Sequence, residues 1–587
     1  MKDFVKMTLA VVCGIILVGL VCFILGFGLL GSAIAASSGK PVLPKSGVLR
    51  IDLSKVTFGE QTLEDNPFGD FDPMSLLSGG MESGSVIGLW DAVQAIDAAA
   101  EDPAVKYIYL RTDGNGTGVS NLGEIRTALS RFRASGKPII TYMETPGTAT
   151  YYLASVSDKI YMPPYLGAQA QLIGVGSQMI FLGDLLNRLG VNVQLIRHGK
   201  YKSAGEMYTR GSSSPENREQ NQRMVDSIWE SIGAEIAAAR GISLEALNAG
   251  IEGLQYNLPQ DFVDGGLIDE LLDRKGMEDK LAALAVVDKF KDIKWIGFSE
   301  YVEAKLVPSK ARQKIAVIYA DGEIVDGSAK SEVAGDRFAS VISKVAADST
   351  VKAVVLRVNS PGGSVLASEK IKTELDRLQE VKPLVASYGA YAASGGYWIS
   401  NRCDKIFSDA TTLTGSIGVF GMVPDLSKTA KDIAHVGVEA VTSHKHGDMF
   451  GMFRPFDQDE YNYMLTSIEA VYDRFTTIVS EGRDMPKDDV DAIGQGRVWT
   501  GADALKIGLV DEIGTLEDAI RFAAVSAGEP DLAKWHIKGY PTPPGAMDQL
   551  MDMVGGRKGD DNALVTAMRR LSKPQVLARM DTEITIQ

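Results

Sequence analysis

The 587-residue chain contains little cysteine and little histidine, with 3 Cys and 5 His. Two of the cysteines, Cys13 and Cys22, lie in an apolar N-terminal stretch, so Cys403 has no partner for a disulfide within the rest of the chain. The histidines form no HExxH pattern, and a single cysteine outside the apolar stretch cannot complete a zinc site of familiar spacing. The sequence therefore predicts no metal and no cofactor, and a body stabilised by packing.

The chain also lacks an excess of basic residues. It has 60 Lys and Arg against 75 Asp and Glu, a formal net charge of −15, and we find no local basic patch. Binding to a phosphate backbone depends on basic side chains, so nucleic acid is not an expected partner. Hydrophobic residues make up 45% and charged residues 23%, which excludes wholesale disorder and a polytopic membrane protein.

One long apolar run stands at the N-terminus. No charged residue occurs between Met7 and Gly39, and residues 7–36 exceed the roughly 20 apolar residues that span a bilayer. A cleaved signal peptide is the alternative, because Ala33-Ile34-Ala35 has the small-residue spacing of a cleavage site, but signal cores run only about 7–15 residues. We expect a single uncleaved transmembrane anchor, whose orientation the balanced flanking lysines leave open.

The rest of the chain contains an internal repeat. The segment KYIYLRTDGNGTGV from Lys106 matches KAVVLRVNSPGGSV from Lys352, and YYLASVSDKIYMPP from Tyr151 matches YWISNRCDKIFSDA from Tyr397, both at an offset of 246 residues. This offset aligns Arg111 with Arg357. Because similar segments recur in order at constant spacing, the sequence indicates a duplicated domain.

Each half alternates helical stretches with β-branched runs, which is typical of parallel sheets covered by helices. We therefore predict an α/β protein with two tandem domains. The predicted division is residues 1–46 (anchor), 47–298 (N-terminal repeat), 299–313 (linker), 314–536 (C-terminal repeat) and 537–587 (a tail or assembly element with no assigned chemistry).

A candidate nucleophile occurs in the C-terminal repeat only. Ser394 lies among small residues in YAASGGY, directly before a helix-like segment, where a substrate backbone has room to approach and helix amides are available to an oxyanion. The N-terminal repeat has Thr148 at the aligned position and has lost both glycines. Upstream, the glycine pair of NSPGGS follows a predicted buried strand, and glycines there permit backbone N–H groups to face a cleft.

The general base is less evident from the residues. A lysine can serve only if desolvation removes its proton, lowering a pKa of about 10.4 by about 3–4 units. Lys202 in YKSAGE is a candidate because Tyr201, Ser203 and Ala204 flank it, although most lysines are solvated surface residues. If Lys202 is the base, one repeat keeps the lysine and the other keeps the serine.

Five segments in order, YKSAGE, NSPGGS, YAASGGYWIS, LTGSIGVFG and GRVWTGADALKIGLVDEIG, resemble the signal peptide peptidase A family, also called protease IV, in its long duplicated bacterial form. The resemblance runs from the N-terminal anchor to about His536. It implies a membrane-anchored serine endopeptidase with a Ser/Lys dyad on two ClpP/crotonase-like domains.

Carried over residue by residue, the resemblance implies that Ser394 is the nucleophile and Lys202 the general base. Ser416 in LTGSIG then orients the lysine, and the amides of Gly363 and Gly395 hold the oxyanion. The family has a short residue where this chain has Tyr391, which changes the expected width of the substrate pocket.

The resemblance also implies partners and a location. The expected substrates are signal peptides and other apolar peptides, the expected assembly is a homo-oligomer (a tetramer), and the expected location is the bacterial inner membrane, with the catalytic body on the periplasmic side. Two other functions remain open at this point: a crotonase-like acyl-CoA hydrolase or isomerase, and a non-catalytic membrane scaffold.

Overall fold

The computed structural model describes residues 41–62, 85–114, 116–307, 309–330, 332–543 and 576–580. Within these ranges, no helix has both the length and the apolar composition needed to cross a bilayer. The predicted anchor, residues 7–36, lies outside the described residues.

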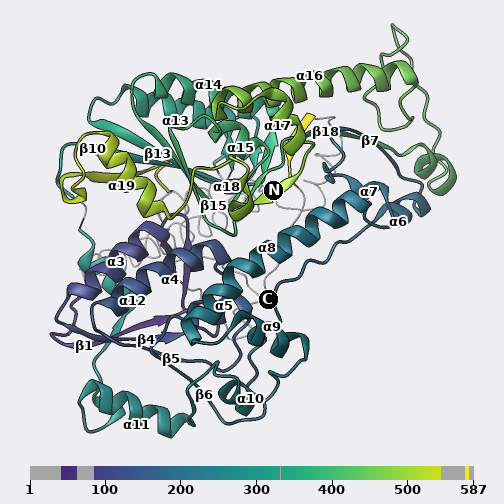
Figure 1. The fold of residues 1–587 in the computed structure, drawn as a ribbon. Coiled ribbons are helices and arrows are strands. Elements are labelled where there is room, and N and C mark those ends of the chain that lie inside the picture. Colours follow the sequence, from purple (N-terminus) through teal and green to yellow (C-terminus); the bar gives the residue numbers. More distant parts are fainter. Residues whose placement is uncertain are drawn as a thin grey trace, which may run out of the picture.

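Two sheets form the framework, one above the other in Figure 1; the lower is parallel and the upper is parallel except for the antiparallel pair β17 and β19. The lower sheet has the strand order β8-β6-β5-β4-β1-β9 and every neighbouring pair in it is parallel. Its strands are β1 (Gly47–Asp52), β4 (Val105–Arg111), β5 (Ile139–Tyr142), β6 (Lys159–Met162), β8 (Glu270–Leu271) and β9 (Trp295–Gly297).

The upper sheet repeats this order. Its path β20-β16-β15-β13-β10-β21 has the same sequence of chain crossings as the lower sheet, with β17 and β19 added beside the end of β15. Its strands are β10 (Lys314–Asp321), β13 (Val351–Ser360), β15 (Leu384–Ala393), β16 (Lys405–Ser408), β17 (Leu413–Gly415), β19 (Val498–Thr500), β20 (Glu512–Ile513) and β21 (His536–Tyr540). The predicted internal repeat is therefore confirmed at the level of topology.

Helices cover both sheets because most connections between neighbouring parallel strands contain a helix. Helices α3 and α13 hold equivalent positions in the two repeats, before β4 and β13. Ser214 caps α8 by accepting a hydrogen bond from the amide of Asn217, with Pro215 in the first turn. The longer helices are α3 (Leu89–Glu101), α4 (Val119–Ala134), α8 (Pro215–Arg240), α9 (Leu244–Glu252), α11 (Arg274–Ala285), α12 (Phe298–Lys305), α13 (Gly335–Ala347), α14 (Val365–Gln379), α16 (Gln458–Arg483) and α19 (Leu516–Ser526).

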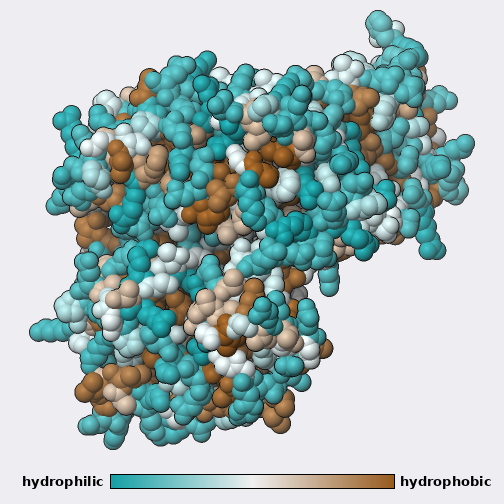
Figure 2. All heavy atoms as spheres, viewed as in Figure 1, coloured by the Kyte–Doolittle hydropathy of each residue, from teal (hydrophilic) through white to brown (hydrophobic). Residues whose placement is uncertain are grey.

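The shorter helices lie at turns between these elements. They are α5 (Thr148–Ala154), α6 (Gly183–Arg188), α7 (Glu206–Thr209), α10 (Pro259–Asp264), α15 (Gly395–Ser400), α17 (Lys487–Ile493) and α18 (Gly501–Lys506). Figure 2 shows mostly hydrophilic side chains on the viewed face, with small hydrophobic patches between them, so most of the apolar side chains lie inside the two layers.

A third sheet joins the two repeats. Its order is β12-β11-β14-β22-β18-β7, and it combines β7 (Asn192–His198) of the N-terminal repeat with β11 (Ile324–Val325), β12 (Val333–Ala334), β14 (Gly362–Ser364) and β18 (Val419–Asp425) of the C-terminal repeat and β22 (Val576–Arg579) of the tail. Strands β2 (Val56–Gly59) and β3 (Ser85–Gly88) form a separate pair. The predicted division into domains stays a prediction, but the two repeats share this sheet.

Apolar packing also crosses between the repeats. Ile228 and Phe262 of the N-terminal repeat belong to the same buried cluster as Ala393, Leu413 and Val498 of the C-terminal repeat. The residues just before Ser394 are therefore held by side chains from both halves of the chain.

Candidate active site

Ser394 occupies the turn between strand β15 and helix α15. Its side chain is fully buried and its backbone has φ 54° and ψ −111°, outside the regions that residues with a side chain ordinarily adopt. The amide of Ser394 donates to the carbonyl of Gly415 at 2.8 Å, which ties the turn to strand β17. Strain of this kind costs about 1–3 kcal/mol and persists where the surroundings over-determine the conformation, which is common at reactive centres.

Lys202 reaches the same point from the other repeat. It follows β7, and its Nζ lies 2.9 Å from Ser394 Oγ, 3.0 Å from Ser416 Oγ and 3.3 Å from the Ser416 carbonyl oxygen. Lys202 is 1% exposed. Lys202 and Ser394 are separated by 192 residues in the chain, and the sheet shared by the two repeats brings Nζ and Oγ to hydrogen-bond distance.

Glycines of the C-terminal repeat make room for Lys202. A Cβ on Gly496 would lie 2.5 Å from Lys202 Cβ, and a Cβ on Gly418 would lie 3.1 Å from Lys202 Cδ. The amide of Tyr201 donates to the carbonyl of Gln495 at 2.9 Å, which fixes the lysine loop against the same segment. The C-terminal repeat thus supplies both the serine and the glycines against which Lys202 packs.

Within the N-terminal repeat, Arg197 and Glu206 support the lysine loop. Arg197 Nη1 donates to the Lys202 carbonyl at 2.6 Å and to Glu206 Oε1 at 3.1 Å. Glu206 is buried and also accepts from the Ser214 amide, and although burial opposes it, these hydrogen bonds and Arg197 lower the pKa of Glu206. Sequence analysis did not assign these two residues, and no local pattern distinguishes them from a surface ion pair.

Ser416 also has an uncommon backbone. Its φ is 50°, its amide donates to the Arg497 carbonyl at 2.7 Å, and it is 1% exposed. This conformation points its hydroxyl and its carbonyl at the Lys202 amino group. The structure therefore brings Ser416 into hydrogen-bond contact with Lys202 Nζ, and its role in orienting the lysine stays a prediction.

The two predicted amide donors lie beside each other. Gly363 has φ 154° and lies so close to β11 that a Cβ would be 1.9 Å from the Ile324 carbonyl oxygen, so only glycine fits. A Cβ on Gly395 would lie 3.1 Å from the Gly363 nitrogen. Gly395 begins α15, where the first amides of a helix have no partner inside the helix. The two glycines thus lie beside each other next to Ser394.

A peptide strand already runs past these glycines. Strand β22 pairs antiparallel with β14 on one side, matching Gly363 with Ala578, and antiparallel with β18 on the other, matching Phe420 with Leu577. Residues of the tail, for which the sequence predicts no chemistry, therefore lie beside Ser394. The described segment of five residues is too short to show a sequence pattern that predicts this position.

A buried ion network also joins the two repeats. Arg357 is 1% exposed, with Nε 2.7 Å from Glu60 Oε2 and Nη1 2.8 Å from Glu124 Oε1. Both carboxylates belong to the N-terminal repeat. Burial raises the pKa of Glu124 to about 7. The neighbouring Glu60 carboxylate acts in the same direction, and Arg357 acts in the opposite one.

Other residues considered in the sequence lie elsewhere. Thr148, the counterpart of Ser394, bonds to the Gln171 carbonyl at 3.2 Å, and His198 Nδ1 bonds to Glu469 Oε2 at 2.8 Å and stacks on Tyr472. Neither is among the hydrogen-bonding partners found for Ser394. Tyr391, which the family pattern does not have, packs against the apolar cluster that lines the site.

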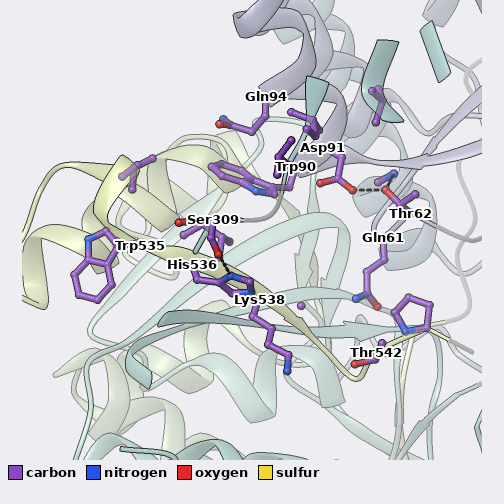
Figure 3. Close-up of a pocket in the computed structure, with 18 of the residues that line it drawn as sticks. Gln61, Thr62, Trp90, Asp91, Gln94, Ser309, Trp535, His536, Lys538 and Thr542 are labelled. Atoms are coloured by element: carbon purple, nitrogen blue, oxygen red, sulfur yellow. Dashed lines mark hydrogen bonds between the residues drawn. The ribbon is translucent and has the colours of Figure 1, made fainter. Parts of the chain in front are cut away.

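A separate cavity of about 890 Å³ lies between the repeats (Figure 3). Trp90 and Asp91 of the N-terminal repeat line it together with Trp535 and with His536 and Lys538 of strand β21, and neither Ser394 nor Lys202 does. We assign this cavity no role in the chemistry of the site.

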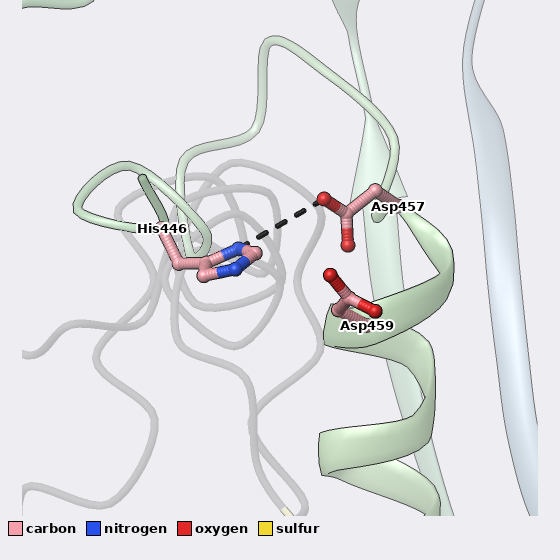
Figure 4. Close-up of side chains that lie close together, drawn as sticks. All are labelled: His446, Asp457 and Asp459. Carbon is pink, nitrogen blue, oxygen red and sulfur yellow. Dashed lines mark ion pairs between the residues drawn. The ribbon is translucent and has the colours of Figure 1, made fainter. Parts of the chain in front are cut away.

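One group of potential metal ligands lies at the start of α16 (Figure 4). Atoms of His446, Asp457 and Asp459 lie within 4.8 Å of one another. His446 also bonds to Glu460 at 2.9 Å and Asp459 to Lys445 at 2.7 Å, so ion pairs explain the cluster. The two aspartates are exposed, and the group carries no assignment.

Comparisons with known proteins place the chain in a family. The sequence model of peptidase family S49 matches residues 131–288, which contain Lys202, and residues 376–528, which contain Ser394 and Ser416. The chain is 36% identical to Protease 4 of Haemophilus influenzae over 451 residues, which cover 74% of this chain and 72% of that protein. It is 37% identical to Protease 4 of Salmonella typhi over 480 residues (80% and 76%) and 31% identical to the chloroplastic serine protease SPPA of Arabidopsis thaliana over 494 residues (82% and 72%).

Proposed function

The chain belongs to peptidase family S49 and is a serine protease, and from this premise we propose that it cleaves peptide bonds with a Ser394/Lys202 dyad. The observation that carries the proposal is the 2.9 Å separation of Lys202 Nζ and Ser394 Oγ, with both side chains buried. Burial favours the neutral amine over the ammonium, and a neutral amine accepts a proton.

In the first step, Lys202 Nζ takes the proton of the Ser394 hydroxyl while Oγ attacks the carbonyl carbon of the substrate. The Ser416 hydroxyl and carbonyl hold the amino group in the direction of Ser394. The carbonyl oxygen becomes an oxyanion that accepts hydrogen bonds from the amides of Gly363 and Gly395. Each such donor is worth about 2.7–4 kcal/mol in comparable sites.

In the second step, the C–N bond breaks and the Lys202 ammonium returns its proton to the leaving amine. The acyl group stays on Ser394 Oγ. A water molecule then attacks the ester while the neutral lysine takes its proton, and the proton returns to Oγ as the acid leaves. The chain begins and ends the cycle with a neutral dyad.

Substrates bind as extended peptides in the slot between β14 and β18. Both walls are strand edges, so a peptide gains main-chain hydrogen bonds on two sides, and the pockets beside the slot provide the selectivity for side chains. We propose signal peptides and other apolar peptides as the substrates, in line with the family resemblance and with the apolar cluster beside the slot.

The same resemblance and the uncharged N-terminal run support a membrane-anchored protein. We propose a single anchor at residues 7–36 in the bacterial inner membrane, the catalytic body on the periplasmic side and a homo-oligomer, a tetramer in the simplest case. The slot would then lie close to the bilayer from which signal peptides are drawn.

The test uses the full chain purified in detergent, with an apolar peptide ester and a serine-reactive probe. Ser394→Ala and Lys202→Met should each lower kcat/KM by a factor on the order of 10⁴ or more. His198→Ala is the matched control because His198 lies on β7, four residues before Lys202, and bonds to Glu469 instead. Near-normal turnover by Lys202→Met together with an inactive His198→Ala would replace the dyad with a Ser/His mechanism.

A further inference from the structure

Helix α8 buries polar side chains along the face that contacts the C-terminal repeat. Asn217, Gln220, Met224 and Ser227 follow one another at spacings of three and four residues, and all four are buried. Gln220 and Ser227 are each 1% exposed. A buried amide lowers stability unless its donors and its acceptor are hydrogen-bonded, so the partners of Gln220 indicate what this side chain does.

The side-chain amide of Gln220 contacts both repeats. Its Nε2 donates to the Tyr201 carbonyl at 3.1 Å, to Ser203 Oγ at 3.0 Å and to Asn217 Oδ1 at 3.3 Å, all in the N-terminal repeat. Its Oε1 accepts from the Val498 amide of β19 at 3.3 Å. The backbone N–H of Val498 only donates and the carbonyl of Tyr201 only accepts, so these two groups fix the orientation of the side-chain amide.

On one side, Gln220 holds the loop that carries the proposed general base. Lys202 lies between Tyr201 and Ser203, the two loop residues to which Nε2 donates. The Tyr201 amide donates in turn to the Gln495 carbonyl at 2.9 Å. Because the loop is bonded directly before and directly after Lys202, these contacts restrict the position of the lysine backbone.

On the other side, Gln220 holds a strand that supports the proposed nucleophile. Val498 lies opposite Gly415 in the antiparallel pair of β17 and β19. The Gly415 carbonyl accepts the amide of Ser394 at 2.8 Å. One strand pair and one hydrogen bond therefore connect Val498 with the turn of the serine.

We propose that Gln220 is a positioning residue of this peptidase: its side-chain amide sets the distance between the lysine loop and the serine turn. The proposal rests on the proposed function of Ser394 and Lys202. Within the described part of the chain, the hydrogen-bond partners of Gln220 include no residue of β14 or β18, which line the slot. Loss of the amide should therefore change kcat more than KM.

The experiment compares full-length Gln220→Met with the wild type on the apolar peptide ester. Methionine keeps the unbranched shape of glutamine and removes both donors and the acceptor. A misplacement of about 1 Å can cost about a hundredfold in rate, so kcat should fall about ten- to a hundredfold while KM stays within about twofold. The serine-reactive probe should label Ser394 more slowly by a similar factor, because labelling depends on activation of the hydroxyl by Lys202.

The pH–rate profile distinguishes positioning from a loss of stability. Burial favours the neutral amine of a lysine, whereas a looser loop admits water and favours the ammonium. The pH at which kcat reaches half of its maximum should therefore be higher in Gln220→Met than in the wild type. A loss of folded molecules alone would lower the amplitude of the profile without moving this midpoint.

Ser227→Ala is the matched control on the same face of α8. Ser227 is as buried as Gln220, and its Oγ lies 2.6 Å from Thr500 Oγ1 of β19. This bond also joins the two repeats, but it does not involve the lysine loop. Ser227→Ala should keep kcat within about twofold of the wild type and should keep the midpoint of the pH profile.

Ser203→Ala tests the route through the lysine loop. It removes one acceptor of Gln220 without changing α8, so it should lower kcat about two- to threefold in the wild-type chain and add no further loss in Gln220→Met. Additive losses would overturn the proposed route. If Gln220→Met does not fold, Ser203→Ala alone carries the test, and a wild-type kcat in this variant overturns the proposal.

The outcomes separate this proposal from the proposed function. If Ser394→Ala is inactive but Gln220→Met keeps the wild-type kcat, the dyad stands and the positioning role is wrong. If Gln220→Met and Ser227→Ala lose kcat equally and neither moves the midpoint of the pH profile, Gln220 only stabilises the fold and the proposal is overturned. If Ser394→Ala is fully active, the dyad itself is wrong, and the positioning role fails with it.

Discussion

Replacement of Arg357 by methionine should destabilise the chain by about 3–5 kcal/mol at pH 8, because it leaves two buried carboxylates without their counter-ion. The guanidinium contacts Glu60 at 2.7 Å and Glu124 at 2.8 Å, and the side-chain exposures of the two carboxylates are both 3%. It also donates to Ser387 Oγ and to the Tyr388 carbonyl, so these groups lose a donor as well. Methionine retains most of the side-chain volume, which limits the contribution of a cavity.

The internal repeat supplies a matched control. Arg111 aligns with Arg357, and its Nη2 lies 2.9 Å from Asp113 Oδ2. The side chains of this pair are more exposed, at 24% for Arg111 and 18% for Asp113. Solvent screens such a pair, so Arg111→Met should cost less than about 1 kcal/mol. Comparing the same substitution at these two equivalent positions thus separates the effect of burying the ion pair between the repeats from the effect of losing an arginine.

The cost at Arg357 should also depend on pH. Without the guanidinium, the buried carboxylates bind protons more readily in the folded than in the unfolded chain, so stability rises as the pH falls. Urea unfolding followed by tryptophan fluorescence at pH 8 and pH 5.5 measures this. The deficit of Arg357→Met relative to wild type should be smaller at pH 5.5. A deficit no larger than that of Arg111→Met, or equal at both pH values, would refute the role of the network.

Three further predictions concern single groups. Burial raises the pKa of Glu124 to about 7 from 4.5, so the contribution of Glu124 to stability is present below pH 4.5 and is lost as the pH rises through 7. The difference in unfolding free energy between wild type and Glu124→Gln should therefore change by about 3 kcal/mol between these pH values. A difference in urea midpoints that does not depend on pH would contradict this prediction. Ser416→Ala removes a 3.0 Å bond to Lys202 and should lower kcat about tenfold and shift the pH–rate profile, whereas an unchanged profile would make Ser416 merely structural. Burial also raises the pKa of the Cys403 thiol, so peptide mapping after treatment of the native chain with N-ethylmaleimide should find Cys403 unmodified; rapid modification would contradict the buried position.

Several parts of the fold could be predicted from the sequence because their causes are local. The helix at 215–240 begins where Ser214 accepts the amide of Asn217 and Pro215 fits the first turn. The two parallel sheets follow from β-branched runs that alternate with amphipathic helices, and their common strand order follows from the repeat.

The candidate site was predictable in its members but not in its geometry. Small residues around Ser394 indicated a nucleophile, while Lys202 resembled a surface lysine until the family pattern was considered. The residues alone gave no reason for Gly496 and Gly418 to surround that lysine, because this packing depends on how two distant loops meet.

The sequence by itself determined the duplication and the α/β class, because these depend on periodicity and aligned segments, whereas the serine and the lysine were predicted from short motifs through the family resemblance. Only the tertiary structure decided that β7 and β18 pair across the repeats, that Arg357 is buried between Glu60 and Glu124, and that β22 enters the slot. Such contacts join residues far apart in the chain. These contacts depend on which strand edges and charged side chains of one repeat meet those of the other, and no local sequence pattern specifies this meeting.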